Sequence, residues 1–371
     1  MNREKSPLVS MTPILKAAEQ ASLSGKPTAV GAFNVNFYTQ ALGILDGLRK
    51  ADAPGIIQAS KGANKFQGGS DKILTMVLQA MADSKHSLPV ALHLDHGDAE
   101  NARVCVDNGF TSVMIDASKE DLKGNIATTR AIVDFAHPKG ASVEGEYGKL
   151  EGVEEDVVHA TTTYADPFLV PYFFNETGVD ALAVAYGTSH GPNKGKGTDK
   201  LAVHIVKHSY QGMKAYGQNE NHFLVSHGSS TVPKELVAEI NRYGGGLRET
   251  AGIPMAKIQE AVAAGIRKIN IDTDLRLGIT ATFRKYFTDH PGVEEKSPSI
   301  LRPIKAYLDE HPEAIDPRDY LKTIDIALLR RDPKGTDLEA VMALIRVRIA
   351  NHVEQLVHDF GCAGLSGKVG R

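Results

Sequence analysis

The amino-acid sequence predicts an α/β fold, a (β/α)8 TIM barrel with additional C-terminal helices. The chain has 371 residues, more than the roughly 250 that one such barrel needs. Short apolar runs alternate with segments of helical spacing from about residue 27 to residue 275. Nearly every run ends in His, Asp, Glu, Asn, Ser or Gly. Barrel enzymes carry such residues at the carboxyl ends of their strands, so one rim is expected to hold the chemistry.

Eight runs rich in Val, Ile, Ala and Leu have the composition of parallel strands buried on both faces. They cover residues 28–36, 55–61, 88–96, 111–118, 141–148, 180–190, 222–230 and 267–275. Helical spacing between the runs is clearest at residues 41–50, 71–83, 99–108, 126–136 and 256–264. A doubly wound open sheet is the alternative. No glycine-rich dinucleotide fingerprint follows the first run, which favours the barrel.

The C-terminal part has a different pattern. Residues 279–288 predict a closing helix, and 290–318 predict an exposed excursion rich in Pro, Glu, Lys and His. Residues 335–360 carry long helical periodicity, and this tail is expected to cover the barrel bottom or to pack against a partner subunit. No linker separates a second unit. We therefore predict a single domain, with a barrel core at about 27–290 and a helical extension at about 291–371.

Composition narrows the class of protein. The chain is 42% hydrophobic and 23% charged with a net charge of −3, and it has no dense Lys/Arg run. These values argue against a nucleic-acid surface but leave room for small phosphate pockets. The two cysteines, Cys105 and Cys362, are expected to be apolar fillers. Neither a signal-peptide pattern nor a membrane span is recognisable, so we expect a cytoplasmic enzyme without a membrane partner.

Three histidines at strand ends are the first candidate site. His96 ends the third run behind Asp95, His190 ends the sixth, and His227 lies near the end of the seventh. Three imidazoles that converge on one rim and leave one position open would form a catalytic zinc shell. A lone histidine at a strand end is more often a hydrogen-bonded structural residue. The residues alone leave both interpretations open.

Two carboxylates of the fifth run, Glu144 and Glu146, share one strand face and are expected to point into the barrel mouth. They could bond to neighbouring strands and orient ligands. Alternatively, one of them could form another metal position together with Asp116.

Phosphate binding is predicted at the loops after the sixth, seventh and eighth runs, where barrels commonly bind phosphate. These loops span 191–194, 228–230 and 270–274, and Lys194 adds a positive charge. Asp272 and Asp274 are expected to recognise hydroxyl groups or to hold Arg276. Tight turns without a ligand are the alternative.

These motifs resemble class II fructose-bisphosphate aldolases, and most closely the class IIB branch that also contains tagatose-bisphosphate aldolases. The matching stretches are GAFNVNF (31–37), QASKGA (58–63), HLDHG (93–97), GFTSVMIDAS (109–118), VEGEYG (143–148), GVDALAVAYGTSHGPNK (178–194), SHGSSTVP (226–233), RETAGIP (248–254) and RKINIDTDLRL (267–277).

The resemblance implies a role for each matching position. It implies zinc ligands at His96, His190 and His227, the catalytic acid/base at Asp95, and a second or displaced metal at Asp116 and Glu146. A monovalent cation is a further expectation. Substrate-binding positions are implied at Gly191, Lys194, Gly228, Ser230, Asn270, Asp272, Thr273, Arg276, Asn34 and Ser60, with Arg276 at the distal phosphate. The chain departs from the family at Tyr147 and Asn193. Its loop 149–165 offers Glu151, Glu154 or Glu155 for proton transfer.

The implied reaction is reversible zinc-dependent cleavage of fructose 1,6-bisphosphate to dihydroxyacetone phosphate and glyceraldehyde 3-phosphate. Such a reaction serves glycolysis, gluconeogenesis or the Calvin cycle, and a homodimer or homotetramer is expected. Tagatose or sedoheptulose bisphosphate is an alternative substrate. The rivals are a zinc-dependent hydrolase, a Schiff-base aldolase that uses Lys268, and a barrel without activity. Lys268 is expected at the strand entry, the wrong end for a Schiff base.

Overall fold

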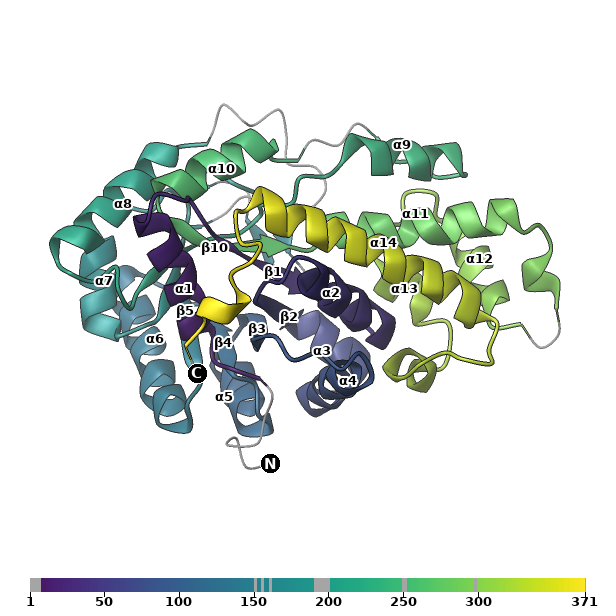
Figure 1. Cartoon of the computed structure of the whole chain (residues 1–371), viewed down its shortest axis with the longest axis horizontal. Coiled ribbons are helices and arrows are strands. Elements are labelled where there is room, and N and C mark those ends of the chain that lie inside the picture. Colours follow the sequence, from purple (N-terminus) through teal and green to yellow (C-terminus); the bar gives the residue numbers. More distant parts are fainter. Residues whose placement is uncertain are drawn as a thin grey trace.

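A closed parallel barrel forms the centre of the protein. The computed structural model describes residues 8–149, 162–189, 201–248, 252–296 and 299–370, and the backbone of 152–154 and 157–159. Within these residues the barrel strands follow the order β1-β10-β9-β8-β5-β4-β3-β2, and all neighbours are parallel. Helices surround the barrel (Figure 1). The predicted (β/α)8 fold class is therefore confirmed.

Each predicted run overlaps one barrel strand, and two strands extend one residue beyond their runs, to Gly97 and to Ile266. The strands are β1 (Val30–Asn34), β2 (Gly55–Ser60), β3 (Val90–Gly97), β4 (Ser112–Ile115), β5 (Ser142–Tyr147), β8 (Ala181–Val184), β9 (Phe223–Ser226) and β10 (Ile266–Ile271). A separate antiparallel pair, β6 (Gly152–Glu154) and β7 (Val157–His159), follows β5. The run 267–275 extends too far, because Asp272 is the N-cap of a helix that begins at Thr273.

Helices connect the barrel strands, and capping residues mark where several of them begin and end. They are α2 (Tyr38–Lys50), α3 (Lys61–Gln67), α4 (Ser70–Asp83), α5 (Ala99–Asn108), α6 (Leu122–Ala136), α7 (Val170–Thr177), α8 (Val203–Ala215), α9 (Lys234–Arg242) and α10 (Met255–Ala264). Asp98 and Asp121 cap α5 and α6 by accepting backbone N–H groups. Gly109 ends α5 in the left-handed conformation that glycine adopts without strain.

Helix α1 (Met11–Leu23) closes the N-terminal end of the barrel. The Met11 backbone N–H donates to Ser142 Oγ at the start of β5. The buried Glu19 of α1 forms an ion pair with Arg267 at the start of β10. This helix therefore fixes the barrel bottom and leaves the opposite end for the site.

The last part of the chain is helical and more buried than predicted. It contains α11 (Thr273–Asp289), α12 (Leu301–Glu310), α13 (Pro317–Leu321) and α14 (Leu338–Asp359). The prediction of an exposed excursion at 290–318 does not hold for one face of α12, while residues such as His290, Pro291 and Glu313 are exposed. Leu301, Ile304 and Leu308 form a fully buried stripe on α12, hidden among polar neighbours in the sequence.

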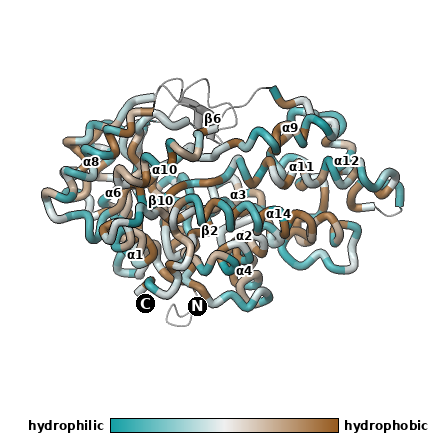
Figure 2. Tube along the Cα trace, turned by 45° about the horizontal axis from the view of Figure 1, so that its top comes forward, coloured by the Kyte–Doolittle hydropathy of each residue, from teal (hydrophilic) through white to brown (hydrophobic). Residues whose placement is uncertain are grey.

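Helix α14 packs along α2 and α11 on the outside of the barrel (Figure 1), so it does not cover the bottom. Figure 2 shows the outer helices alternating between hydrophobic and hydrophilic segments, as helices with one buried face do. Among the described residues, no helix combines the length and the apolar character that crossing a bilayer requires.

Candidate active site

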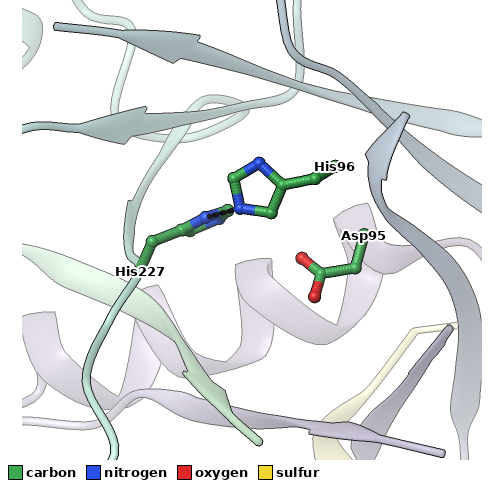
Figure 3. A group of neighbouring side chains, drawn as sticks. All are labelled: Asp95, His96 and His227. Carbon is green, nitrogen blue, oxygen red and sulfur yellow. Dashed lines mark hydrogen bonds between the residues drawn. The ribbon is translucent and has the colours of Figure 1, made fainter. Parts of the chain in front are cut away.

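A bulge at the end of β3 brings two adjacent residues to the same place. Leu94 pairs with Val113 and Gly97 with Ile115, so β3 has one residue more than β4 in this interval. His96 within the bulge has φ of 47°, in the left-handed region. Strand residues next to each other normally face opposite sides, but a bulge changes the direction of a side chain. Asp95 and His96 consequently belong to one group at the barrel mouth (Figure 3).

Side-chain amides from three other strands surround the Asp95 carboxylate, which is almost fully buried. Asn34 Nδ2 donates to Oδ2 at 3.0 Å, and Gln58 Nε2 donates to the same oxygen at 3.1 Å. From a third strand, Asn270 Nδ2 donates to Oδ1 at 3.1 Å. Sequence reasoning included Asn34 and Asn270 but missed Gln58. Its position two residues before Ser60 on β2, on the same strand face, was the available signal.

His96 and His227 face each other at the mouth, as Figure 3 shows. His227 Nδ1 lies 2.7 Å from His96 Nε2, and the two rings meet edge to face. Burial lowers the pKa of His227, which favours the neutral ring that binds metal ions. Asp95, His96 and His227 present ligand atoms within 4.8 Å of one another. This donor set fits a divalent transition metal such as zinc. His190, the third predicted ligand, lies outside the described residues.

A second group shares His96 and could also hold a metal ion. His96, Asp116 and Glu146 place ligand atoms within 4.8 Å of one another. His96 Nδ1 lies 3.2 Å from Asp116 Oδ2, while the backbone and hydroxyl of Ser118 donate to Asp116 Oδ1. Burial would raise the pKa of Asp116, but His96 and Ser118 hold it well below its usual range. The structure thus brings together the residues predicted for a second or alternative metal position.

Glu144 does not belong to that second group. Its Oε1 lies 2.7 Å from His227 Nε2, and its Oε2 lies 2.8 Å from Lys268 Nζ. Lys268 is fully buried inside the barrel, so its ammonium group reaches the barrel interior instead of staying at the strand entry. Burial would raise the pKa of Glu144, but the ammonium of Lys268 and the ring of His227 hold it far below its usual range.

The loops after β9 and β10 lie together beside this centre. Ser230 Oγ accepts the Asp272 backbone N–H, and Thr273 begins α11 directly after Asp272. Gly228 has φ of 60°, and a Cβ atom there would lie 2.5 Å from the Ser189 carbonyl oxygen. A side chain at this position would therefore not fit the turn. Gly191 and Lys194, which were predicted to bind phosphate, lie outside the described residues.

Two aspartates of this region have different partners. Asp272 forms an ion pair with Arg276, as one of the two predictions for it required. Asp274 instead accepts hydrogen bonds from the Thr231 and Val232 backbone N–H groups. It is also only 1% exposed, so the prediction that it recognises a hydroxyl group or holds Arg276 is wrong. Its role is to fix the loop after β9.

Arg276 lies in a cluster that the sequence analysis did not foresee. Its second partner is Asp316, at 2.6 Å, and Asp316 also binds Arg318 at 2.7 Å. Two guanidinium groups are therefore held by one carboxylate. The segment 316–318 was predicted as part of an exposed excursion, and it follows α12 in the chain.

Ser60 lies at the mouth end of β2 and is the N-cap of α3. Its hydroxyl accepts the Ala63 backbone N–H at 3.1 Å. This bond explains why a serine ends the strand. Ser60 is also the pairing partner of Asp95 on the neighbouring strand β3.

Comparison with known proteins identifies the family of this site. The family model described as "Fructose-bisphosphate aldolase class-II" matches residues 9–365. A fructose-bisphosphate aldolase from Giardia intestinalis is 40% identical over 294 residues, which cover 79% of this chain and 82% of that protein. One from Pseudomonas aeruginosa is 35% identical over 359 residues, covering 89% and 91%.

Solved structures agree in fold. The YdjI aldolase from Escherichia coli K12 has a TM-score of 0.64 at 25% identity, and the match covers 97% of this chain and 99% of that one. The fructose-bisphosphate aldolase of Campylobacter jejuni has a TM-score of 0.67 at 20% identity over 96% of both chains, which supports the fold alone.

Proposed function

Because the chain belongs to the class II fructose-bisphosphate aldolase family, we propose that it catalyses the reversible cleavage of fructose 1,6-bisphosphate to dihydroxyacetone phosphate and glyceraldehyde 3-phosphate. The observation that carries this proposal is the buried Asp95 carboxylate, surrounded by three amide donors and adjacent to the His96–His227 pair. A carboxylate beside two imidazoles supports the proposal, because a metal-dependent carbon–carbon lyase requires a proton acceptor next to its metal ligands.

Asp95 is the proposed acid/base. In the cleavage direction it takes the proton of the C4 hydroxyl group, which releases the electrons that break the C3–C4 bond. The amides of Asn34, Gln58 and Asn270 all donate to this carboxylate, so they fix its position before substrate arrives.

The proposed resident metal is Zn²⁺, held by His96, His227 and His190. When bound, Zn²⁺ supplies positive charge that stabilises the negative charge developing at the ketose carbonyl oxygen. Asp116 and Glu146 are the proposed ligands of a second or alternative metal position. One of Glu151, Glu154 or Glu155 is proposed to return a proton to the three-carbon product.

Phosphate groups are proposed to bind at two places. Gly191, Lys194, Gly228, Ser230, Asp272 and Thr273 are proposed to surround the phosphate and hydroxyl groups of the dihydroxyacetone end. Arg276 is proposed to meet the distal phosphate, and the guanidinium of Arg318 lies nearby through the shared partner Asp316. We also propose that the enzyme works in the cytoplasm as a homodimer or homotetramer, in glycolysis, gluconeogenesis or the Calvin cycle.

The test is to assay fructose and tagatose 1,6-bisphosphates side by side, with and without a chelator, and to quantify both triose phosphates and inorganic phosphate. We expect chelator-sensitive release of two triose phosphates, with fructose bisphosphate preferred. Preference for tagatose bisphosphate would change the substrate assignment. Release of inorganic phosphate, or inactivity on both sugars, would overturn the proposed reaction.

A further inference from the structure

Lys268 is a charged side chain in a place where lysine is rarely found. It is fully buried in β10, inside the barrel, whereas lysine is almost never fully buried unless it is paired. A register irregularity between Ile266 and Lys268 inserts one extra residue into β10 opposite β9. Next to it, the buried Arg267 pairs with Glu19 of α1 at the barrel bottom, while Lys268 contacts residues inside the barrel.

The first contact of Lys268 determines how the amide of Asn270 is oriented. Lys268 Nζ lies 2.7 Å from Asn270 Oδ1. An ammonium group can only donate, so it requires the carbonyl oxygen of the amide on its side. The NH₂ group of Asn270 must then face the other way, where it donates to Asp95 Oδ1 at 3.1 Å. The Asp95 carboxylate, which accepts, requires the same orientation, so the lysine and the carboxylate hold the Asn270 amide from its two ends.

The second contact of Lys268 acts on His227. Lys268 Nζ lies 2.8 Å from Glu144 Oε2, and Glu144 Oε1 lies 2.7 Å from His227 Nε2. Because a carboxylate oxygen can only accept, His227 carries its proton on Nε2 and presents the lone pair of Nδ1 to the group that contains His96 and Asp95. Partners of this kind orient metal-binding histidines and fix their tautomer.

We propose that Lys268 is a positioning residue that orients both the metal-binding ring of His227, through Glu144, and the acid/base Asp95, through Asn270. The proposal rests on the proposed function for the role of Asp95, while the His227 part concerns metal binding only. Lys268 does not touch the reacting atoms. Its hydrogen bond to Asn270 and its ion pair with Glu144 also occupy the amine, which opposes its use as a Schiff-base nucleophile.

The test replaces Lys268 with methionine, which has similar volume and no charge. In Lys268→Met we expect Zn²⁺ and Co²⁺ to bind about 10- to 100-fold more weakly in chelator competition. We also expect a changed Co²⁺ absorption spectrum. At saturating metal, kcat should fall by about 10-fold or more with little change in KM, because Asn270 no longer fixes Asp95.

Arg267→Met is the matched control, because it removes the adjacent buried cation of the same strand without touching the site. It should destabilise the fold but keep metal affinity and the Co²⁺ spectrum. Equal losses of metal affinity in both variants would overturn the proposal, as would unchanged metal affinity and kcat in Lys268→Met. If wild-type protein lacks aldolase activity but Lys268→Met still weakens metal binding, the proposed function fails and the His227 part stands.

A charge-balanced double variant covers the case in which Lys268→Met does not fold. In Lys268→Met/Glu144→Gln no unpaired charge remains at these two positions, and the carbonyl oxygen of the introduced amide can still accept from His227 Nε2. We expect metal affinity to recover toward wild type while kcat stays low. Recovery of both quantities would contradict the Asn270 part of the proposal, and recovery of neither would contradict the His227 part.

Discussion

At the scale of single residues, the site depends on polar groups that are buried and satisfied. Asp95 is only 1% exposed, a costly position for a carboxylate unless it is hydrogen-bonded. Three amide donors offset that cost, and each of them lies on a different barrel strand. The carboxylate is therefore held in one place before a substrate binds.

Replacement of Asp95 tests its role most directly. We expect Asp95→Ala to lower kcat by about 10²- to 10⁴-fold, the range typical of a lost general acid/base. The bound metal should be retained, because the imidazoles remain. Steady-state assays together with elemental analysis of the purified variant would measure both quantities. Retention of most of the activity would show that the assigned role is wrong.

A buried histidine away from the site predicts how stability depends on pH. Burial, reinforced by the positive charge of Arg49, lowers the pKa of His86 to about 4. The folded state therefore keeps His86 neutral. Below about pH 6.5 the unfolded chain binds the proton more readily. This residue's contribution to the free energy of unfolding is full above about pH 6.5 and is lost as the pH falls toward about 4.

Denaturant titrations at about pH 7 and about pH 5 measure this loss. We expect the wild-type free energy of unfolding to fall by about 2 kcal/mol more than that of His86→Gln over this interval. An equal fall in both proteins would mean that His86 is not the titrating group.

At the scale of elements, close helix packing fixes the C-terminal extension on the barrel. A Cβ atom on Gly47 of α2 would lie 2.6 Å from the Ala350 carbonyl oxygen of α14, and one on Gly43 would lie 2.8 Å from Ile349 Cβ. The close packing of α14 against α2 therefore requires glycine, which has no side chain, at positions 43 and 47. Gly278 of α11 also faces α14, but its nearest neighbour would be Arg348 Cδ at 3.5 Å, an ordinary contact.

Gly47 and Gly278 make a matched pair for mutagenesis. Gly47→Ala should destabilise the protein by about 1–3 kcal/mol, because the added methyl group meets backbone that cannot move freely. Gly278→Ala should stabilise it by up to about 1 kcal/mol, since alanine favours the helix. Thermal and denaturant unfolding would measure both, and a stabilised Gly47→Ala variant would contradict this description of the α2–α14 contact.

At the scale of the whole molecule, the site is assembled from distant parts of the chain. Asp95 comes from β3, Asn34 from β1 and Asn270 from β10, and the closed barrel makes β1 and β10 neighbours. The segment 316–318 follows α12, whose buried residues belong to the main core, and it contacts Arg276 of α11. Metal binding to such a site should stabilise the whole fold, since the unfolded chain has no such arrangement.

Removal of the metal should therefore affect activity and stability together. We expect a chelator to abolish cleavage and to lower the melting temperature, and Zn²⁺ to restore both. At a free-metal concentration of about 1,000 times Kd the stabilisation would be about 4 kcal/mol. Full activity in metal-free protein would contradict the proposal, and borohydride trapping with substrate would then test Lys268 as a Schiff-base residue.

The sequence by itself determined the barrel, because each buried strand needs its own apolar run and each run appears in order. It also determined which residue types end the strands, including Asp95, His96 and His227. Local pattern was sufficient here, since strand burial and strand-end polarity depend on neighbours within a few positions.

Only the tertiary structure decided how those residues are used. Strand register and partners far apart in the sequence determine the geometry of the site. They account for the extra residue in β3, the contact of Gln58 with Asp95, the contact of Lys268 with Glu144, and the attachment of Asp274 to the loop after β9. Periodicity does not report such pairings. It also missed the buried stripe of α12, because polar residues between Leu301, Ile304 and Leu308 dominate the local composition. The chemistry of the mouth was readable from residue types, whereas its geometry follows from the closure of the barrel.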